Sequence, residues 1–231
     1  MSMHTGHRQR LKQQYRDNGL DGFTDIQVLE LLLYYCIPRI DTNPIAHRLL
    51  DRFGSLDHVL DTPAEELMKV EGVGENAATF LSLITDAGRY YQVKKSENMK
   101  ILSSVIQCGQ YLLPRFHGKT NETVFLLCLD AKCKVLACKE VGEGSVNSAS
   151  VPIRRIVEMA LLHKATSVVL AHNHPSGVAL PSPEDVVSTK RTAAALAAVE
   201  ITLVDHIIVA DDDFVTLGQS GLYRAEEYSY G

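Results

Sequence analysis

The feature that most constrains the fold of this 231-residue chain is a change of pattern close to residue 100. Before that point the sequence carries only helix signals, namely apolar stretches of helical length with capping residues in front and glycine or proline behind. The polar stretch 94–100 follows, and beyond it short apolar runs typical of strands alternate with helical segments. The sequence therefore predicts an α+β protein, with a small all-helical module over residues 1–98 and a domain of strands and helices over residues 101–231.

The expected elements have recognisable boundaries. Thr24 and Gln27 have the spacing of a capping box and open an apolar helix that Pro38 ends. Asn43 and Pro44 open the next helix, because proline is favoured at the first helical position. The remaining expected elements are helices at about 64–70, 76–95, 101–113, 152–163 and 183–199, and strands at about 123–130, 134–141, 167–174, 201–210 and 214–217.

Charge and cysteine usage exclude several classes of protein. The net charge of −5 is spread along the chain, and neither half has the positive excess that nucleic-acid binding usually leaves. The five cysteines include no CxxC pair, which favours reduced thiols, and the spacing of Cys133 and Cys138 is poor for a metal site. The longest apolar stretch, 28–38, contains Glu30 and is too short to span a bilayer. We therefore expect a soluble cytoplasmic protein with no membrane segment and no secretory signal.

The segment AHNHPSGVALPSPED contains the most informative spacing in the sequence. His172 and His174 stand two residues apart at the end of an apolar strand, so their rings project to the same side. Asp185 follows a turn and stands at the start of the next helix. Two imidazoles and one carboxylate are three of the four ligands that zinc takes, and the fourth position stays open for water in a catalytic site. The spacing predicts a catalytic site with one zinc ion per chain.

Helix capping offers a second interpretation of part of this segment. Ser182, Pro183 and Asp185 have the positions of an N-cap serine, a proline at the first helical residue and a capping acid at the third. Ser182 and Asp185 can cap the helix and also take part in a metal site. Capping leaves unexplained the two histidines on an otherwise apolar strand, where burial without a partner is costly.

The same segment resembles a known family. The pattern H-x-H-x7-S-x2-D resembles the JAMM signature of MPN-domain metalloproteases, and HNHPSG with VDHIIVADDDFVTL resembles the bacterial RadC family of UPF0758 type. The resemblance spans nearly the whole chain. It implies an MPN domain with a mixed sheet flanked by helices, a zinc-bound water, a glutamate base from an upstream strand and a serine that assists the tetrahedral intermediate. In eukaryotic relatives the substrate is an isopeptide bond to a ubiquitin-like protein.

The resemblance also assigns roles to residues outside the metal ligands. Glu122, directly before an expected strand, matches the acidic residue of the family and is the expected general base, with Glu140 as the alternative. Ser182 is expected to donate a hydrogen bond to the developing oxyanion. His206 is expected to be a hydrogen-bonded structural histidine, or else a group that supports a metal ligand. The chain departs from the family at residues 152–155, where Pro-Ile-Arg-Arg lacks the usual glutamate after Pro-Arg.

The helical module suggests a competing function. FGSLDHVLDTPAEELMKVEGVGENAATFL resembles a helix-hairpin-helix unit, in which Gly72 and Gly74 would aim backbone N–H groups at a DNA phosphate. Glu71 and Glu75 flank this turn and oppose such a contact. Two functions follow: a zinc hydrolase acting on a peptide or protein, and a DNA-associated protein with an accessory MPN domain. The first is preferred, with weak DNA binding at most, and homo-oligomer formation stays open.

Overall fold

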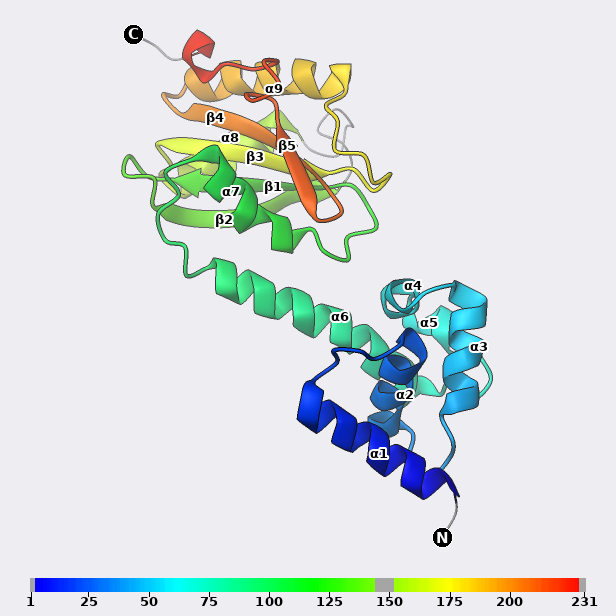
Figure 1. The fold of residues 1–231 in the computed structure, drawn as a ribbon. Helices are drawn as coiled ribbons and strands as arrows, with labels where there is room; N and C mark the ends of the chain where they lie inside the picture. The colour runs from blue at the N-terminus through cyan, green and yellow to red at the C-terminus, as the bar shows by residue number, and fades with distance from the viewer. Residues whose placement is uncertain (1–2, 144–151, 229–231) are drawn as a thin grey trace. The chain divides into compact units, whose positions relative to one another are not determined.

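The computed structural model describes residues 3–143 and 152–228 (Figure 1). The chain divides into two compact units, Met1–Gly88 and Arg89–Gly231. The division falls inside helix α6 (Glu75–Ser96), which ends within the polar stretch where the sequence suggested a boundary. Each unit has its own apolar core.

The first unit is helical in the part that the structure describes. Thr24 accepts from the backbone N–H of Gln27, and the Gln27 side chain accepts from the backbone N–H of Thr24, so the expected capping box is confirmed. Gly54 ends the third helix with a φ of 94°, a conformation that costs glycine little. Besides α6, the helices are α1 (Met3–Asn18), α2 (Asp25–Cys36), α3 (Asn43–Phe53), α4 (Leu56–Asp61) and α5 (Ala64–Leu67).

The second unit is built on one mixed five-stranded sheet, so the α+β prediction is confirmed. Its helical elements are α7 (Val105–Leu112), η1 (Leu113–Arg115), α8 (Ile153–Leu162), α9 (Pro183–Ala197) and η2 (Ala225–Tyr228). Its strands are β1 (Thr123–Leu129), β2 (Val135–Glu143), β3 (Ser167–Asn173), β4 (Thr202–Ala210) and β5 (Asp213–Thr216). The strand order is β2-β1-β3-β4-β5; β3 and β4 are parallel and the other pairs antiparallel.

Helices cover both faces of this sheet. Helices α8 and α9 lie on one face and α7 lies on the other (Figure 1). Alternate side chains of the central strands pack against these helices. Both faces of β1 are therefore buried, as the continuous apolar run TVFLLCL predicts. No helix among residues 3–143 and 152–228 combines the length and the apolar character needed to cross a bilayer.

The topology brings three segments together at one end of the sheet. Val124, near the start of β1, pairs with His172, near the end of β3, because the two strands are antiparallel. The chain leaves β3 and returns at the N-terminus of α9, which packs along β4. The start of β1, the end of β3 and the first turn of α9 therefore meet, and they carry the residues that the sequence singled out.

Candidate metal centre

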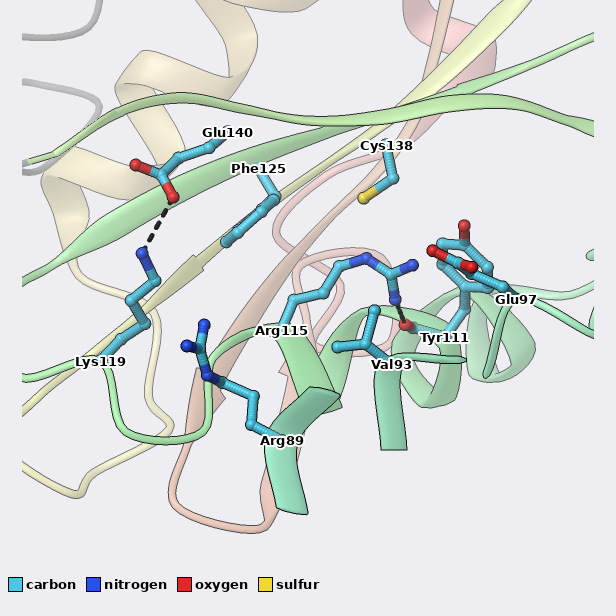
Figure 2. A pocket seen from close by; sticks show the side chains of 9 residues that line it. All are labelled: Arg89, Val93, Glu97, Tyr111, Arg115, Lys119, Phe125, Cys138 and Glu140. Carbon is cyan, nitrogen blue, oxygen red and sulfur yellow. Dashed lines mark hydrogen bonds and ion pairs between the residues drawn. The ribbon is translucent and has the colours of Figure 1, made fainter. Parts of the chain in front are cut away.

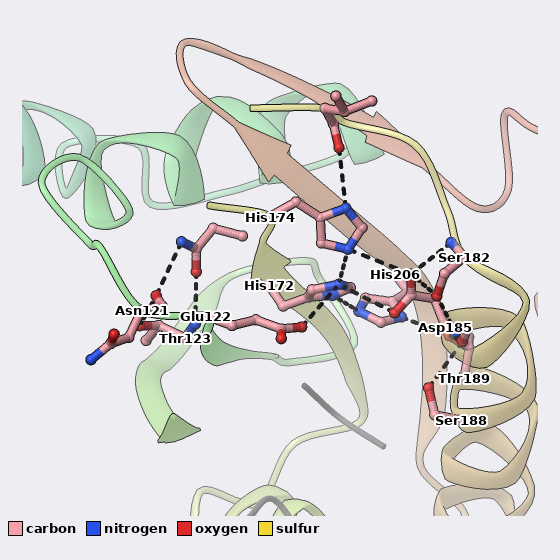
Figure 3. Close-up of polar contacts among 12 residues, drawn as sticks. Asn121, Glu122, Thr123, His172, His174, Ser182, Asp185, Ser188, Thr189 and His206 are labelled. Carbon is pink, nitrogen blue, oxygen red and sulfur yellow. Dashed lines mark hydrogen bonds and ion pairs between the residues drawn. The ribbon is translucent and has the colours of Figure 1, made fainter. Parts of the chain in front are cut away.

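Two histidines at the end of β3 form the middle of the cluster (Figure 3). His172 is fully buried, whereas about a fifth of the His174 side chain is exposed. Their side chains lie on the same face because Asn173 between them takes the alternate position of the strand. The Nε2 atoms of the two rings are 2.8 Å apart. The expected juxtaposition of the two imidazoles is therefore present.

The first turn of α9 places a carboxylate against both rings. Oδ1 of Asp185 lies 3.3 Å from Nε2 of His172, and Oδ2 lies 3.6 Å from Nε2 of His174. Ser182 is the N-cap of the same helix: its hydroxyl accepts from the Asp185 backbone N–H and donates to Oδ2 of Asp185 at 2.7 Å. The expected capping box and the contact with the histidines thus occur together. Capping fixes the carboxylate in its place beside the rings.

Glu122 completes the cluster from the opposite side (Figure 3). Its carboxylate lies 3.8 Å from Nε2 of His172, and about a quarter of its side chain is exposed. The loop that carries Glu122 is held by Asn173, whose Oδ1 accepts from the backbone N–H of Thr123 at 2.7 Å. The Asn173 amide group also donates to the backbone carbonyls of Lys119 and Asn121. This role of Asn173 was not predicted, although its signal is present in the sequence: an asparagine between two histidines on an apolar strand.

The alternative base, Glu140, lies elsewhere. It pairs with Phe125 across β1 and β2, so it shares the face of the sheet opposite to that of Val124 and His172. Glu140 lines a hollow of about 350 Å³. Its carboxylate accepts a hydrogen bond from Lys119 at 2.9 Å (Figure 2). In the described part of the chain, the cluster of donors that can hold a metal ion includes Glu122 and not Glu140.

Electrostatics separates the two carboxylates of the cluster. Burial raises the pKa of Glu122, and the neighbouring histidines only partly oppose that shift. Burial also acts to raise the pKa of Asp185, but its contacts with His172 and with Ser182 outweigh burial and hold the pKa of this carboxyl below its ordinary value. Asp185 is therefore the more firmly ionised of the two groups, and Glu122 is the more basic one.

His206 lies behind His172 in the core. It is on β4, and its fully buried ring places Nε2 2.8 Å from Nδ1 of His172. Nδ1 of His206 lies 2.6 Å from the hydroxyl of Thr189, a residue of α9 for which the sequence predicted no role. Burial lowers the pKa of His206 well below its ordinary value, so the ring is neutral. The expectation that His206 is hydrogen-bonded is confirmed, and its partner is one of the candidate metal ligands.

The donor set fits a metal ion. Donor atoms of Glu122, His172 and His174 lie within 4.8 Å of one another, and the oxygens of Asp185 are as close to the two rings. Nδ1 of His174 faces the Val178 carbonyl at 3.1 Å, which can only accept, so Nε2 of this ring carries the lone pair. A second nitrogen 2.8 Å away requires a positive charge or a proton between the two. Imidazoles with carboxylates suit zinc.

The glycine turn of the first unit lies between α5 and α6. Gly72 has a φ of 94°, and a β-carbon there would stand 2.9 Å from the side chain of Ile45, so the turn requires glycine at this position. Gly74 has open space around its α-carbon. Arg48 donates to the Glu71 carbonyl at 3.0 Å, which ties a basic side chain to the turn itself. A DNA contact by this turn stays a prediction.

The fold and the cluster define the class of protein: a mixed sheet between helices, with two histidines and two carboxylates gathered at one end, is the arrangement of a JAB domain. Residues 102–222 match the family described as RadC-like JAB domain. The chain is also 34% identical over 224 residues to the UPF0758 protein FN0909 of Fusobacterium nucleatum subsp. nucleatum, an alignment that covers 94% of this chain and 97% of that protein. The chain belongs to the RadC-like JAB domain family, as the resemblance of its motifs implied.

Proposed function

We propose that this protein is a zinc-dependent hydrolase that cleaves peptide or isopeptide bonds. One observation carries the proposal: the Nε2 atoms of His172 and His174 face each other at 2.8 Å beside an ionised carboxylate that a capping box holds in place. A structural zinc site would be closed by a fourth protein ligand of similar strength. Here the fourth group is a partly exposed glutamate, which leaves room for water and substrate.

The two carboxylates take different roles in this proposal. Asp185 is the metal ligand, because its two oxygens lie 3.3 Å and 3.6 Å from the two rings and its side chain is almost completely buried. Glu122 is the general base, because it stands farther away at 3.8 Å from His172, is partly open to solvent, and has a raised pKa. A base in this position takes a proton from water and returns it to the leaving group.

Zinc, when bound, polarises a substrate carbonyl and lowers the pKa of a bound water toward about 7. The protein's own residues supply the rest of the chemistry. Glu122 accepts the proton of the attacking water, and Ser182 stands where its hydroxyl can turn from Oδ2 of Asp185 to a developing oxyanion. Asn173 keeps the Glu122 loop against the end of β3 and so holds the base beside the two histidines that would bind the metal.

The surroundings of the cluster favour a peptide substrate. The loop that follows His174 exposes the apolar side chains of Val178 and Leu180. The same loop contacts the more accessible ring through the Val178 carbonyl, which lies 3.1 Å from Nδ1 of His174. An extended chain with apolar side chains would bury that surface on binding. The same loop contains no charged side chain between Pro175 and Pro181, so we expect it to recognise a substrate through shape and apolar contact.

A comparison of cleaved and bound proteins across a whole proteome tests the proposal. The wild-type protein is compared with Glu122→Gln, which keeps the size and polarity of the side chain but removes the base. The variant should keep its zinc and lose hydrolysis by roughly 10²–10⁴-fold. Glu140→Gln is the matched control, since it removes a glutamate from the opposite face of the sheet. Loss of cleavage in Glu140→Gln together with full activity in Glu122→Gln would contradict the assignment of the base.

A further inference from the structure

A chain of hydrogen bonds leads from the helix that carries Asp185 to the ring of His172. Thr189, one turn after Asp185 on α9, places its hydroxyl 2.5 Å from the backbone carbonyl of Asp185 and 2.6 Å from Nδ1 of His206. Nε2 of His206 then meets Nδ1 of His172 at 2.8 Å. Figure 3 draws these contacts. All four residues are almost completely buried, so water does not compete for the hydrogen bonds.

The contact between Thr189 and the Asp185 carbonyl determines which group donates in each of these hydrogen bonds. A backbone carbonyl can only accept, and the Thr189 hydroxyl has a single hydrogen, so this hydrogen goes to the Asp185 carbonyl. Nδ1 of His206 must then carry a hydrogen and donate it to the Thr189 oxygen. The reverse direction would leave two oxygen acceptors 2.5 Å apart with no hydrogen between them.

The ring of His206 is fully buried, and burial disfavours a charged imidazole, so the ring is neutral. With its hydrogen on Nδ1, it has a lone pair on Nε2. This lone pair accepts from Nδ1 of His172, which therefore carries a hydrogen. The nitrogen of His172 that faces His174 is then the one able to bind a metal ion. Metal-binding histidines generally have their other ring nitrogen bonded to a neighbouring group, which fixes the ring and raises its affinity.

We propose that Thr189 and His206 are positioning residues that fix the tautomer of His172, with the backbone carbonyl of Asp185 as the anchor of the chain. Asp185 then has two roles: its carboxylate would bind the metal, and its backbone carbonyl fixes the orientation of the His172 ring through Thr189 and His206. This proposal rests on the proposed zinc function for its purpose, but the tautomer itself is a property of the metal-free protein.

The test uses three variants on one helix. Thr189→Val removes the hydroxyl at nearly constant volume, and Thr189→Ser restores it. Thr192→Val is the matched control, because Thr192 is a fully buried threonine of the same helix whose hydroxyl has no hydrogen-bond partner within the described residues. Zinc affinity is measured by competition with a chelator, and ring nitrogen shifts are measured by ¹⁵N NMR on the zinc-free proteins.

His172 of the zinc-free wild type should be protonated at Nδ1, and Thr189→Val should weaken zinc binding by about 10–100-fold. Thr189→Ser and Thr192→Val should bind zinc as the wild type does. A His172 ring protonated only at Nε2 would overturn the proposal, and so would a Thr189→Val affinity equal to that of Thr192→Val. If the wild type bound no zinc, the proposed function would fail, and the NMR result alone would decide this inference.

Discussion

Replacing Asn173 by alanine should detach the loop that carries the proposed base. The buried N–H of Thr123 would lose its only acceptor among the described contacts, a bond of 2.7 Å to the Asn173 amide. A buried donor without a partner costs about 1–3 kcal/mol. The carbonyls of Lys119 and Asn121 belong to partly or fully exposed residues and can bond to water instead, so they add little. We expect the free energy of unfolding to fall by about 2 kcal/mol.

Two measurements separate this local effect from a general loss of stability. Urea denaturation gives the free energy of unfolding, and amide hydrogen exchange gives the protection of the Thr123 N–H, which should fall sharply in Asn173→Ala. Val169→Ala, at a fully buried position of the same strand, is the control, because it should cost a similar amount, about 2 kcal/mol, without selectively exposing Thr123. A loss under about 0.5 kcal/mol with unchanged exchange at Thr123 would refute the role of Asn173.

Three further predictions concern the capping box of α9, the glycine turn of the first unit and the affinity for DNA. Ser182→Ala should lower the free energy of unfolding by about 1 kcal/mol in urea denaturation while Ser182→Thr keeps most of it, and equal stability of all three proteins would contradict the capping role. Gly72→Ala should cost about 1–3 kcal/mol through its positive φ and the side chain of Ile45, whereas Gly74→Ala should melt close to the wild type. DNA binding, followed by fluorescence anisotropy of a labelled duplex, should be weak and should fall steeply with salt, and nanomolar affinity at physiological salt would reverse the ranking of the two functions.

The elements of the second unit were predictable because their signals are local. The strand TVFLLCL and the capping box at Ser182 are set by side-chain pattern and by residues three apart, and both appear where the sequence places them. The proximity of His172, His174 and Asp185 was likewise predictable. The histidines stand at a strand end and the aspartate at the start of the next helix, and one turn joins the two elements.

Contacts between segments that are far apart in the sequence could not be predicted from local patterns. Helix α1 has a weak apolar pattern and is held by contacts with residues far along the chain, such as that of His7 with Glu30 and that of Arg8 with the Ile37 carbonyl. The partnership of Thr189 with His206 depends on the register between β3 and β4 and on how α9 packs against β4, neither of which the sequence spacing contains. That Glu122 lies beside His172 and Glu140 on the opposite face of the sheet follows from the pairing of β1 with β2 and β3, which the sequence spacing does not contain.

Zinc content is the most direct test of the central claim. Protein purified without chelators and analysed by inductively coupled plasma mass spectrometry should contain close to one zinc ion per chain. His174→Ala should lose the zinc and keep the wild-type circular dichroism spectrum, since the His174 ring is partly exposed and its loss leaves the core intact. A wild-type protein that neither contains nor takes up zinc, or a His174→Ala protein that retains it fully, would contradict the assignment of the metal centre.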